Sequence, residues 1–103
     1  MEEFESKIKE LFGAMRDWER RPLLSVGSVV VELLKLPRRE LKRGVEPEKL
    51  VIHIRLQDSF KGIFIEDSKE LEDLKLAINR ESVEKIARAL DEVNRRQVVE
   101  YGI

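Results

Sequence analysis

Hydrophobic residues recur at helical spacing over the first twenty positions of the chain. They form one continuous stripe of six side chains: Phe4, Ile8, Leu11, Phe12, Met15 and Trp18. A stripe with this period is typical of an amphipathic helix. Acidic residues gather at its start and arginines at its end, as the helix dipole favours. The pattern therefore predicts a helix over residues 2–21, which we expect Pro22 to end.

Two stretches in the middle of the chain predict strands. Residues 28–36 begin with three consecutive valines, and β-branched residues favour strands. A helix remains an alternative there, because Val29, Leu33 and Leu36 also fit helical spacing. Residues 50–56 alternate apolar and polar positions, as a half-buried strand does. Residues 57–62 then form a turn, and residues 63–66 return as the second arm of a hairpin.

The remaining segments differ in how clearly their pattern points to one structure. Residues 80–96 carry a second helical stripe, with Asn79 as the N-cap. Residues 67–79 are ambiguous: Asp67 and Glu70 suggest a helix start, but the alternation over residues 74–78 favours a strand. Residues 37–44 are expected to form one or two helical turns, with a proline at the start and a glycine at the end. The apolar tail 97–103 suggests a short edge strand.

These elements predict a single α+β domain over residues 1–103. We expect an N-terminal helix, a mainly antiparallel sheet of three or four strands, and a C-terminal helix, with both helices on one sheet face. That face is aliphatic and consists of Leu50, Ile52, Ile54, Ile63 and Ile65. The opposite face carries Val51, Phe64, His53 and Arg55 and is expected to be open.

Composition excludes several kinds of site. The 103 residues include no cysteine and one histidine, which excludes disulfides, thiolate zinc sites and sites built on several histidines. No apolar run has the roughly 18 residues that a membrane span needs, so we expect no membrane association and a cytoplasmic location. Charged residues make up 40% of the chain and nearly cancel, to a net charge of −1. This residue usage is typical of thermophile proteins.

His53 is the one candidate catalytic residue. General acid–base catalysis would need a carboxylate beside the ring and a pocket around it. The chain contains no phosphate-binding, nucleotide-binding or zinc-protease motif, and we expect no cofactor and no metal site. A surface histidine on the polar side of the sheet is the interpretation that we favour.

The strongest concentration of one charge sign is a basic cluster of four residues: Arg38, Arg39, Lys42 and Arg43. Such a cluster suits contact with phosphates. If residues 29–36 were helical, the region would look like a winged-helix DNA-binding protein. The lack of aromatic residues between these cations argues against binding to single strands.

The hydrophobic surplus of the chain suggests self-association. The valine-rich strand and the apolar tail exceed what one small core needs, and exposed apolar patches usually mark partner sites. The interface candidates are Val51, Phe64, Val98, Val99, Tyr101 and Ile103. We therefore expect a small, non-catalytic, homo-oligomeric interaction or regulatory protein, most simply a homodimer. Nucleic-acid binding through the basic cluster is the alternative, and an enzyme with His53 at a dimer cleft is the third hypothesis.

Overall fold

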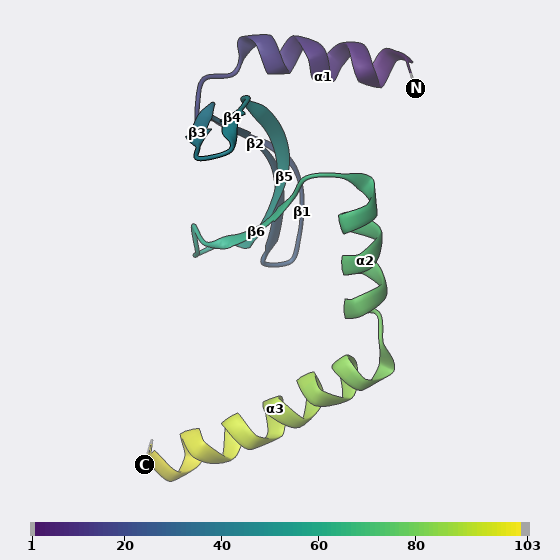
Figure 1. Cartoon of the computed structure of the whole chain (residues 1–103). Coiled ribbons are helices and arrows are strands. Elements are labelled where there is room, and N and C mark those ends of the chain that lie inside the picture. Colours follow the sequence, from purple (N-terminus) through teal and green to yellow (C-terminus); the bar gives the residue numbers. More distant parts are fainter. Residues whose placement is uncertain (1, 102–103) are drawn as a thin grey trace. The chain divides into compact units, whose positions relative to one another are not determined.

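The computed structural model describes residues 2–101, with side chains from 2 to 95. It divides into two compact units, Met1–Asp67 and Ser68–Ile103. The elements are α1 (Glu2–Ala14), β1 (Arg20–Val26), β2 (Val29–Leu36), β3 (Arg39–Leu41), β4 (Gly44–Glu46), β5 (Lys49–Leu56), β6 (Gly62–Ile65), α2 (Ser68–Ile78) and α3 (Glu81–Tyr101) (Figure 1). The expected α+β class, with an N-terminal helix, an antiparallel sheet and C-terminal helices, is confirmed. The single domain over residues 1–103 stays a prediction.

Four strands form an antiparallel sheet in the order β1-β2-β5-β6. This order follows the chain, and the small β3–β4 hairpin is inserted in the connection between the two central strands (Figure 1). The valine-rich segment is the strand β2, which pairs with β5 along its full length, from Val29 opposite Leu56 to Leu36 opposite Lys49. The expected hairpin of β5 and β6 is also present.

The sheet buries the face that we expected to be open. Cross-strand pairing places Glu32 opposite His53 and Leu34 opposite Val51, and all four side chains are buried. His53 also lies opposite Phe64, whose ring packs against it. A row of interacting neighbours on β2, β5 and β6 therefore covers His53, which the alternation within one strand could not reveal. On the aliphatic face Leu33 and Ile65 are buried, Leu50, Ile52 and Ile54 are half-buried, and Ile63 is exposed. Helix packing on that face stays a prediction.

The first helix ends seven residues earlier than its apolar stripe predicts. α1 stops at Ala14, and residues 20–26 form the edge strand β1. The ammonium group of Lys35, on β2, donates to the backbone oxygens of Phe12 at 2.5 Å and Met15 at 3.0 Å. A cation at this position satisfies carbonyl groups that a helix C-terminus leaves without partners. Pro22 lies in β1, beside a register shift, where an edge strand tolerates a proline.

The C-terminal region is helical where a strand was expected. Residues 68–78 form α2, because Leu71, Leu74 and Ile78 share one helical face and this outweighs the short alternation in the segment. The helix expected over residues 80–96 is confirmed, but α3 continues to Tyr101. Residues 97–101 thus continue the helix and do not form an edge strand, and residues 102–103 lie outside the described residues. None of the described helices is both long enough and apolar enough to cross a bilayer.

Gly62 is where the sheet requires a residue without a side chain. A Cβ atom there would overlap the backbone oxygen of Ile54 and lie 2.8 Å from His53 Nε2.

We expect Gly62→Ala to lower the free energy of unfolding by about 1–3 kcal/mol, the usual cost of overpacking. Gly13→Ala is the matched control, because the added methyl group meets no atom within 4 Å. Inside a helix it should stabilise by about 1 kcal/mol. Urea unfolding measures both, and equal effects would contradict the close approach.

Candidate functional site

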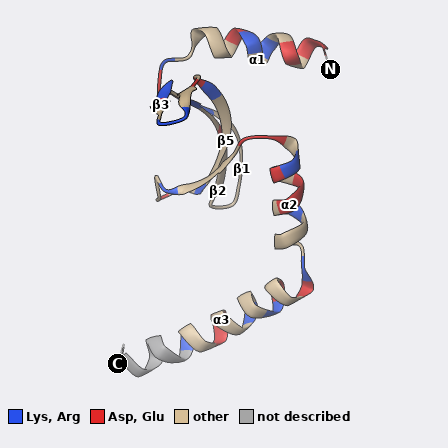
Figure 2. Ribbon diagram, in the orientation of Figure 1, with Lys and Arg blue, Asp and Glu red and all other residues tan. Residues whose placement is uncertain are grey.

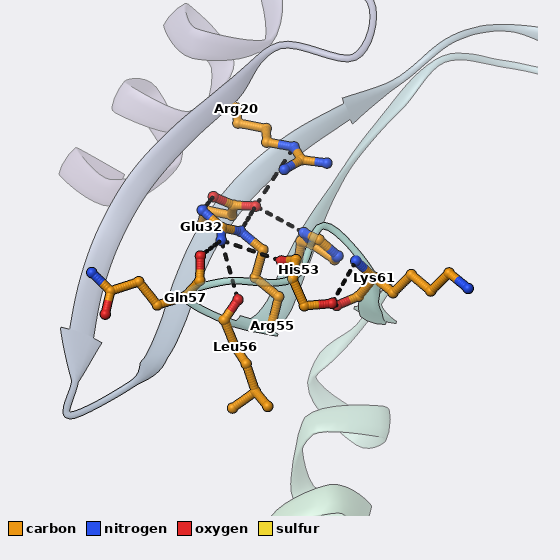
Figure 3. A network of polar contacts seen from close by, with 8 residues as sticks. Arg20, Glu32, His53, Arg55, Leu56, Gln57 and Lys61 are labelled. Atoms are coloured by element: carbon orange, nitrogen blue, oxygen red, sulfur yellow. Dashed lines mark hydrogen bonds and ion pairs between the residues drawn. The ribbon is translucent and has the colours of Figure 1, made fainter.

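A buried pair of ionisable residues lies at the centre of the sheet. Glu32 on β2 and His53 on β5 are directly opposite each other, and their side chains are only 4% and 2% exposed. Glu32 Oε2 lies 2.8 Å from His53 Nδ1 (Figure 3). The carboxylate comes from the acidic residue that interrupts the valine- and leucine-rich strand. The pair is therefore set by strand register, with no loop involved.

Two arginines surround the same carboxylate. Arg55 Nε lies 3.0 Å from Glu32 Oε2, and Arg20 Nε lies 3.7 Å from it (Figure 3). Arg55 also donates through Nη1 to the backbone oxygens of Leu56, Gln57 and Ser59. One guanidinium group therefore connects the buried carboxylate to the turn between β5 and β6. The cluster joins β1, β2, β5 and that turn.

The cluster keeps Glu32 ionised. Burial acts to raise the pKa of Glu32, but the hydrogen bonds from Arg55 and His53 outweigh it, so that the pKa is lowered. An ionised carboxylate only accepts hydrogen bonds, so His53 Nδ1 is the donor. Among the described residues, no buried side-chain nitrogen or oxygen lacks a hydrogen-bond partner. Complete pairing of this kind stabilises a buried polar network.

The arrangement meets one requirement of the enzyme hypothesis and fails another. The requirement that is met is a carboxylate within hydrogen-bonding reach of His53, which Glu32 on the neighbouring strand supplies. The requirement that fails is an accessible pocket around the ring. His53 as a whole is only 1% exposed, so the ring cannot meet an external substrate in this structure. The described part of the chain also contains no group of three or more residues suited to hold a metal ion. The cluster connects side chains of three strands to the turn between β5 and β6.

Exposed aromatic rings lie at the edges of this cluster. The rings of Phe64 and His53 are 5.1 Å apart and tilted by 54°. The Arg20 guanidinium lies 5.4 Å from the centre of the Phe60 ring, within cation–π range. Both phenylalanines keep a large exposed area. The buried ion cluster thus fixes the positions of two rings that reach solvent.

A pocket of about 200 Å³ lies on the same sheet face, next to Phe64. Trp18, from the segment before β1, and Leu36 and Pro37, at the end of β2, supply most of its apolar wall. Charged residues complete it: Arg39, Glu46, Lys49 and Glu66. The pocket is thus amphipathic, with two aromatic rings and a set of polar groups, and it is formed within one unit of the chain.

The charged residues of the pocket form a chain of ion pairs. Glu46 accepts hydrogen bonds from Lys49 at 2.6 Å and Arg39 at 2.8 Å, and Lys49 also pairs with Glu66. The Lys49 and Arg39 hydrogen bonds lower the pKa of Glu46 to about 2. In return, Glu46 raises the pKa values of Arg39 and Lys49. Arg39, Glu46 and Lys49 are therefore ionised at neutral pH, and Glu46 lies between the two cations.

The basic cluster lies on the β3–β4 hairpin, where we expected a short helix. Leu41 pairs with Gly44, so Lys42 and Arg43 form the turn, and Gly44 adopts a φ of 140° that favours glycine. The glycine thus serves the hairpin and does not end a helix. Since β2 is also a strand, the winged-helix arrangement is wrong. Figure 2 shows the resulting concentration of positive charge around β3.

The cations of the hairpin differ in their partners. Arg39 belongs to the ion-pair chain, whereas Arg38 lies 3.9 Å from the exposed Glu40. Lys42 and Arg43 form no ion pair with any residue that the structure describes. Arg39 thus contributes to the pocket, whereas Arg38, Lys42 and Arg43 lie outside its ion-pair chain.

The interface candidates fall into three groups. Phe64 is exposed, Val51 is buried, and the side chains of Val98, Val99, Tyr101 and Ile103 lie outside the described residues. Trp18 and Glu32 were missed as site residues. Two sequence signals pointed to them: Trp18 is the only tryptophan, and Glu32 is the only charged residue among the first six positions of β2. Comparison with protein families, curated proteins and solved structures finds no match to this chain.

Removing the Glu32 charge tests the role of the buried cluster. We expect Glu32→Gln to destabilise the protein by about 3 kcal/mol at pH 7, because it leaves buried cationic and polar groups without their acceptor. Since folding lowers the pKa of Glu32, its contribution is present above about pH 4.5 and is lost as the pH falls through the folded-state value. Urea unfolding of both proteins from pH 7 to pH 3 should show the difference shrinking.

Glu40→Gln is the control, because this carboxylate is exposed and its one ion pair is long. We expect it to change stability by less than about 0.5 kcal/mol at any pH. A Glu32→Gln protein as stable as the parent would contradict the account of the cluster.

Proposed function

We propose that the protein binds single-stranded nucleic acid on the sheet face that carries Trp18 and Phe64. In this proposal, bases stack on the two exposed rings, while Arg38, Lys42 and Arg43 of the hairpin contact phosphates. Aromatic rings beside a positively charged surface are the usual means by which proteins bind single strands. In the sequence, no aromatic residue stands between the cations of the basic cluster. In the fold, Trp18 and Phe64 lie on this face although they are 20 or more residues from the cluster along the chain.

The conformation of Trp18 is the observation that carries this proposal. Its φ is 67°, in the left-handed region, which is strained for a bulky residue. The backbone is held there because Trp18 N–H donates to Lys35 O at 2.7 Å and Lys35 N–H donates to Glu19 O at 3.1 Å. Burial does not offset the strain, since Trp18 is 60% exposed. Strain of this kind often marks a functional site.

The charge distribution supports the same ligand. Residues 15–66 contain eleven Lys and Arg against eight Asp and Glu, so the net negative charge of the chain comes from the helical segments. Within the pocket, Arg39 and Lys49 are already paired. Their ion-pair chain suits the donors and acceptors on a base edge, which carries no net charge. The cations of the hairpin that lie outside this chain are then the phosphate contacts.

The size of the pocket favours a single strand over a duplex. A volume of about 200 Å³ accommodates one planar ring system and not a double helix. In a duplex the bases are stacked on one another and do not present their faces, whereas a single strand can place each base against a protein ring. We therefore expect weak or no binding to duplex DNA of the same length.

The intrinsic fluorescence of Trp18 provides a direct test, because the chain has no other tryptophan. We expect a dodecamer of deoxythymidine to quench this fluorescence at low salt as a base stacks on the ring. With three phosphate contacts, log affinity should fall with log salt with a slope of about −2. Heparin, which carries charge without bases, should bind without quenching. Equal quenching by heparin, or no binding of the dodecamer at low salt, would overturn the proposal.

Variants separate stacking from phosphate contact in the same assay with a labelled dodecamer. Trp18→Gly should leave stability within about 1 kcal/mol, because glycine accepts the left-handed backbone, yet weaken binding roughly 10-fold. Phe4→Ala, which removes an exposed ring from α1, is its control and should have no effect. Lys42→Ala with Arg43→Ala should reduce the salt slope, whereas Lys69→Ala with Lys75→Ala on α2 should not.

A heat-adapted source is a second part of the proposal. It is supported by the Arg39–Glu46–Lys49–Glu66 chain and by the i,i+4 pairs along α2 and α3, since ion-pair networks gain importance at high temperature. We expect a thermal midpoint above about 65 °C, the upper end of the range for mesophile domains. A calorimetric midpoint within that range would contradict it. The cytoplasmic location expected from the sequence stays a prediction.

A further inference from the structure

The helix α3 carries a second surface with a different chemistry. Its large apolar side chains are spaced by three, four and three residues, and each is 44–60% exposed: Val83, Ile86, Leu90 and Val93. This spacing is the a and d pattern of a heptad repeat, which keeps one narrow row on the same side of a helix. We refer to these four residues as the α3 seam.

From residue 81 to residue 95 the charges of α3 avoid the seam. In the heptad register that the seam defines, the seven charged residues between 81 and 95 all fall at the outer b, c and f positions: Glu81, Glu84, Lys85, Arg88, Asp91, Glu92 and Arg95. The ion pairs Glu81–Lys85 and Glu84–Arg88 connect these outer positions along the helix. The outer surface is thus suited to water, and the seam is left without charges of its own.

The positions that flank the seam identify its occupant. Between residues 82 and 94 they are occupied by small or uncharged residues, Ser82, Ala87, Ala89 and Asn94, and the next such position is Arg96. In paired helices these e and g positions face each other, and like charges there would repel a second copy of the same helix. Between residues 82 and 94 no such charge is present, and the alanines permit close approach of the two backbones. The seam is therefore complementary to itself.

We infer that the protein forms a homodimer in which α3 of one chain packs against α3 of a second copy, in place of the packing of this helix on the sheet that the sequence suggested. The self-association expected from the sequence thus uses the α3 seam and not the sheet face that carries Phe64. It lies on a different unit from the proposed nucleic-acid surface and does not depend on that proposal. Each dimer then carries two copies of the Trp18 pocket.

The mass of the protein in solution tests the inference. Light scattering at several concentrations up to about 1 mM should give a species with twice the 12.1 kDa mass of the chain. Because no charged residue flanks the seam between residues 82 and 94, the dimer should persist in 1 M salt, where charge pairs are screened and nucleic-acid binding is lost. A mass of one chain throughout would overturn the inference and leave the Trp18 pocket unaffected.

Two neighbouring substitutions provide the matched comparison. Leu90→Lys places a charge in the α3 seam and should yield a monomer with unchanged helical circular dichroism. Asp91→Lys introduces the same side chain at an outer position and should remain a dimer. A dimer of Leu90→Lys that is as stable as the parent dimer would contradict the seam.

Cross-linking provides a test that keeps the apolar seam intact. The chain has no cysteine of its own, so only an introduced cysteine can react. Ala89→Cys and Asn94→Cys both lie beside the seam. If the two helices are antiparallel, a short bis-maleimide should join Cys at position 89 of one chain to Cys at position 89 of the other. If they are parallel, it should join position 89 of one chain to position 94 of the other. Arg88→Cys, on the outer surface, should form neither product. Equal cross-linking from the outer and inner positions would show random collision and overturn the inference.

Discussion

The carboxylate of Glu32 is the interaction on which the sheet unit depends. It is buried between two central strands and receives hydrogen bonds from groups on β5, with a guanidinium from β1 close by. A buried charge is tolerated only where its partners are in place. The register of β2 against β5, the position of the edge strand and the shape of the β5–β6 turn must therefore be correct together. A slip of one residue would move Glu32 to the other face.

The same dependence explains which parts of the fold the sequence could predict. The strands over residues 28–36 and 50–56 and the helix over residues 80–96 follow from local pattern, and the structure confirms them. Which face of the sheet is buried is not a local property. It depends on the identity of the cross-strand neighbours of His53, and these come from residues 21 positions earlier and 11 positions later. The alternation within β5 assigns its residues to two faces but does not indicate which of the two faces is more deeply buried.

The error at the end of α1 has a similar cause. Met15 and Trp18 continue the apolar stripe of the helix, and nothing in that segment signals its end. At its end Lys35, from a strand 20 or more residues further along the chain, donates to the backbone oxygens of Phe12 and Met15, a partner that the local pattern could not show. The basic hairpin is a different case, since the turn residues and Gly44 fit either a helix end or a hairpin. The sequence placed this cluster of cations in a short helix, and the structure places it at a hairpin.

The position of the β3–β4 hairpin has a consequence for how the protein can change. The main sheet is a meander in chain order, and the hairpin is inserted between two strands that already pair along their full length. Its ladder closes on itself, from Arg39 opposite Glu46 to Leu41 opposite Gly44. Residues at its tip can therefore be exchanged, or the hairpin lengthened, without altering the register that the buried carboxylate requires. Evolution can revise the charged surface of this fold while its centre stays fixed.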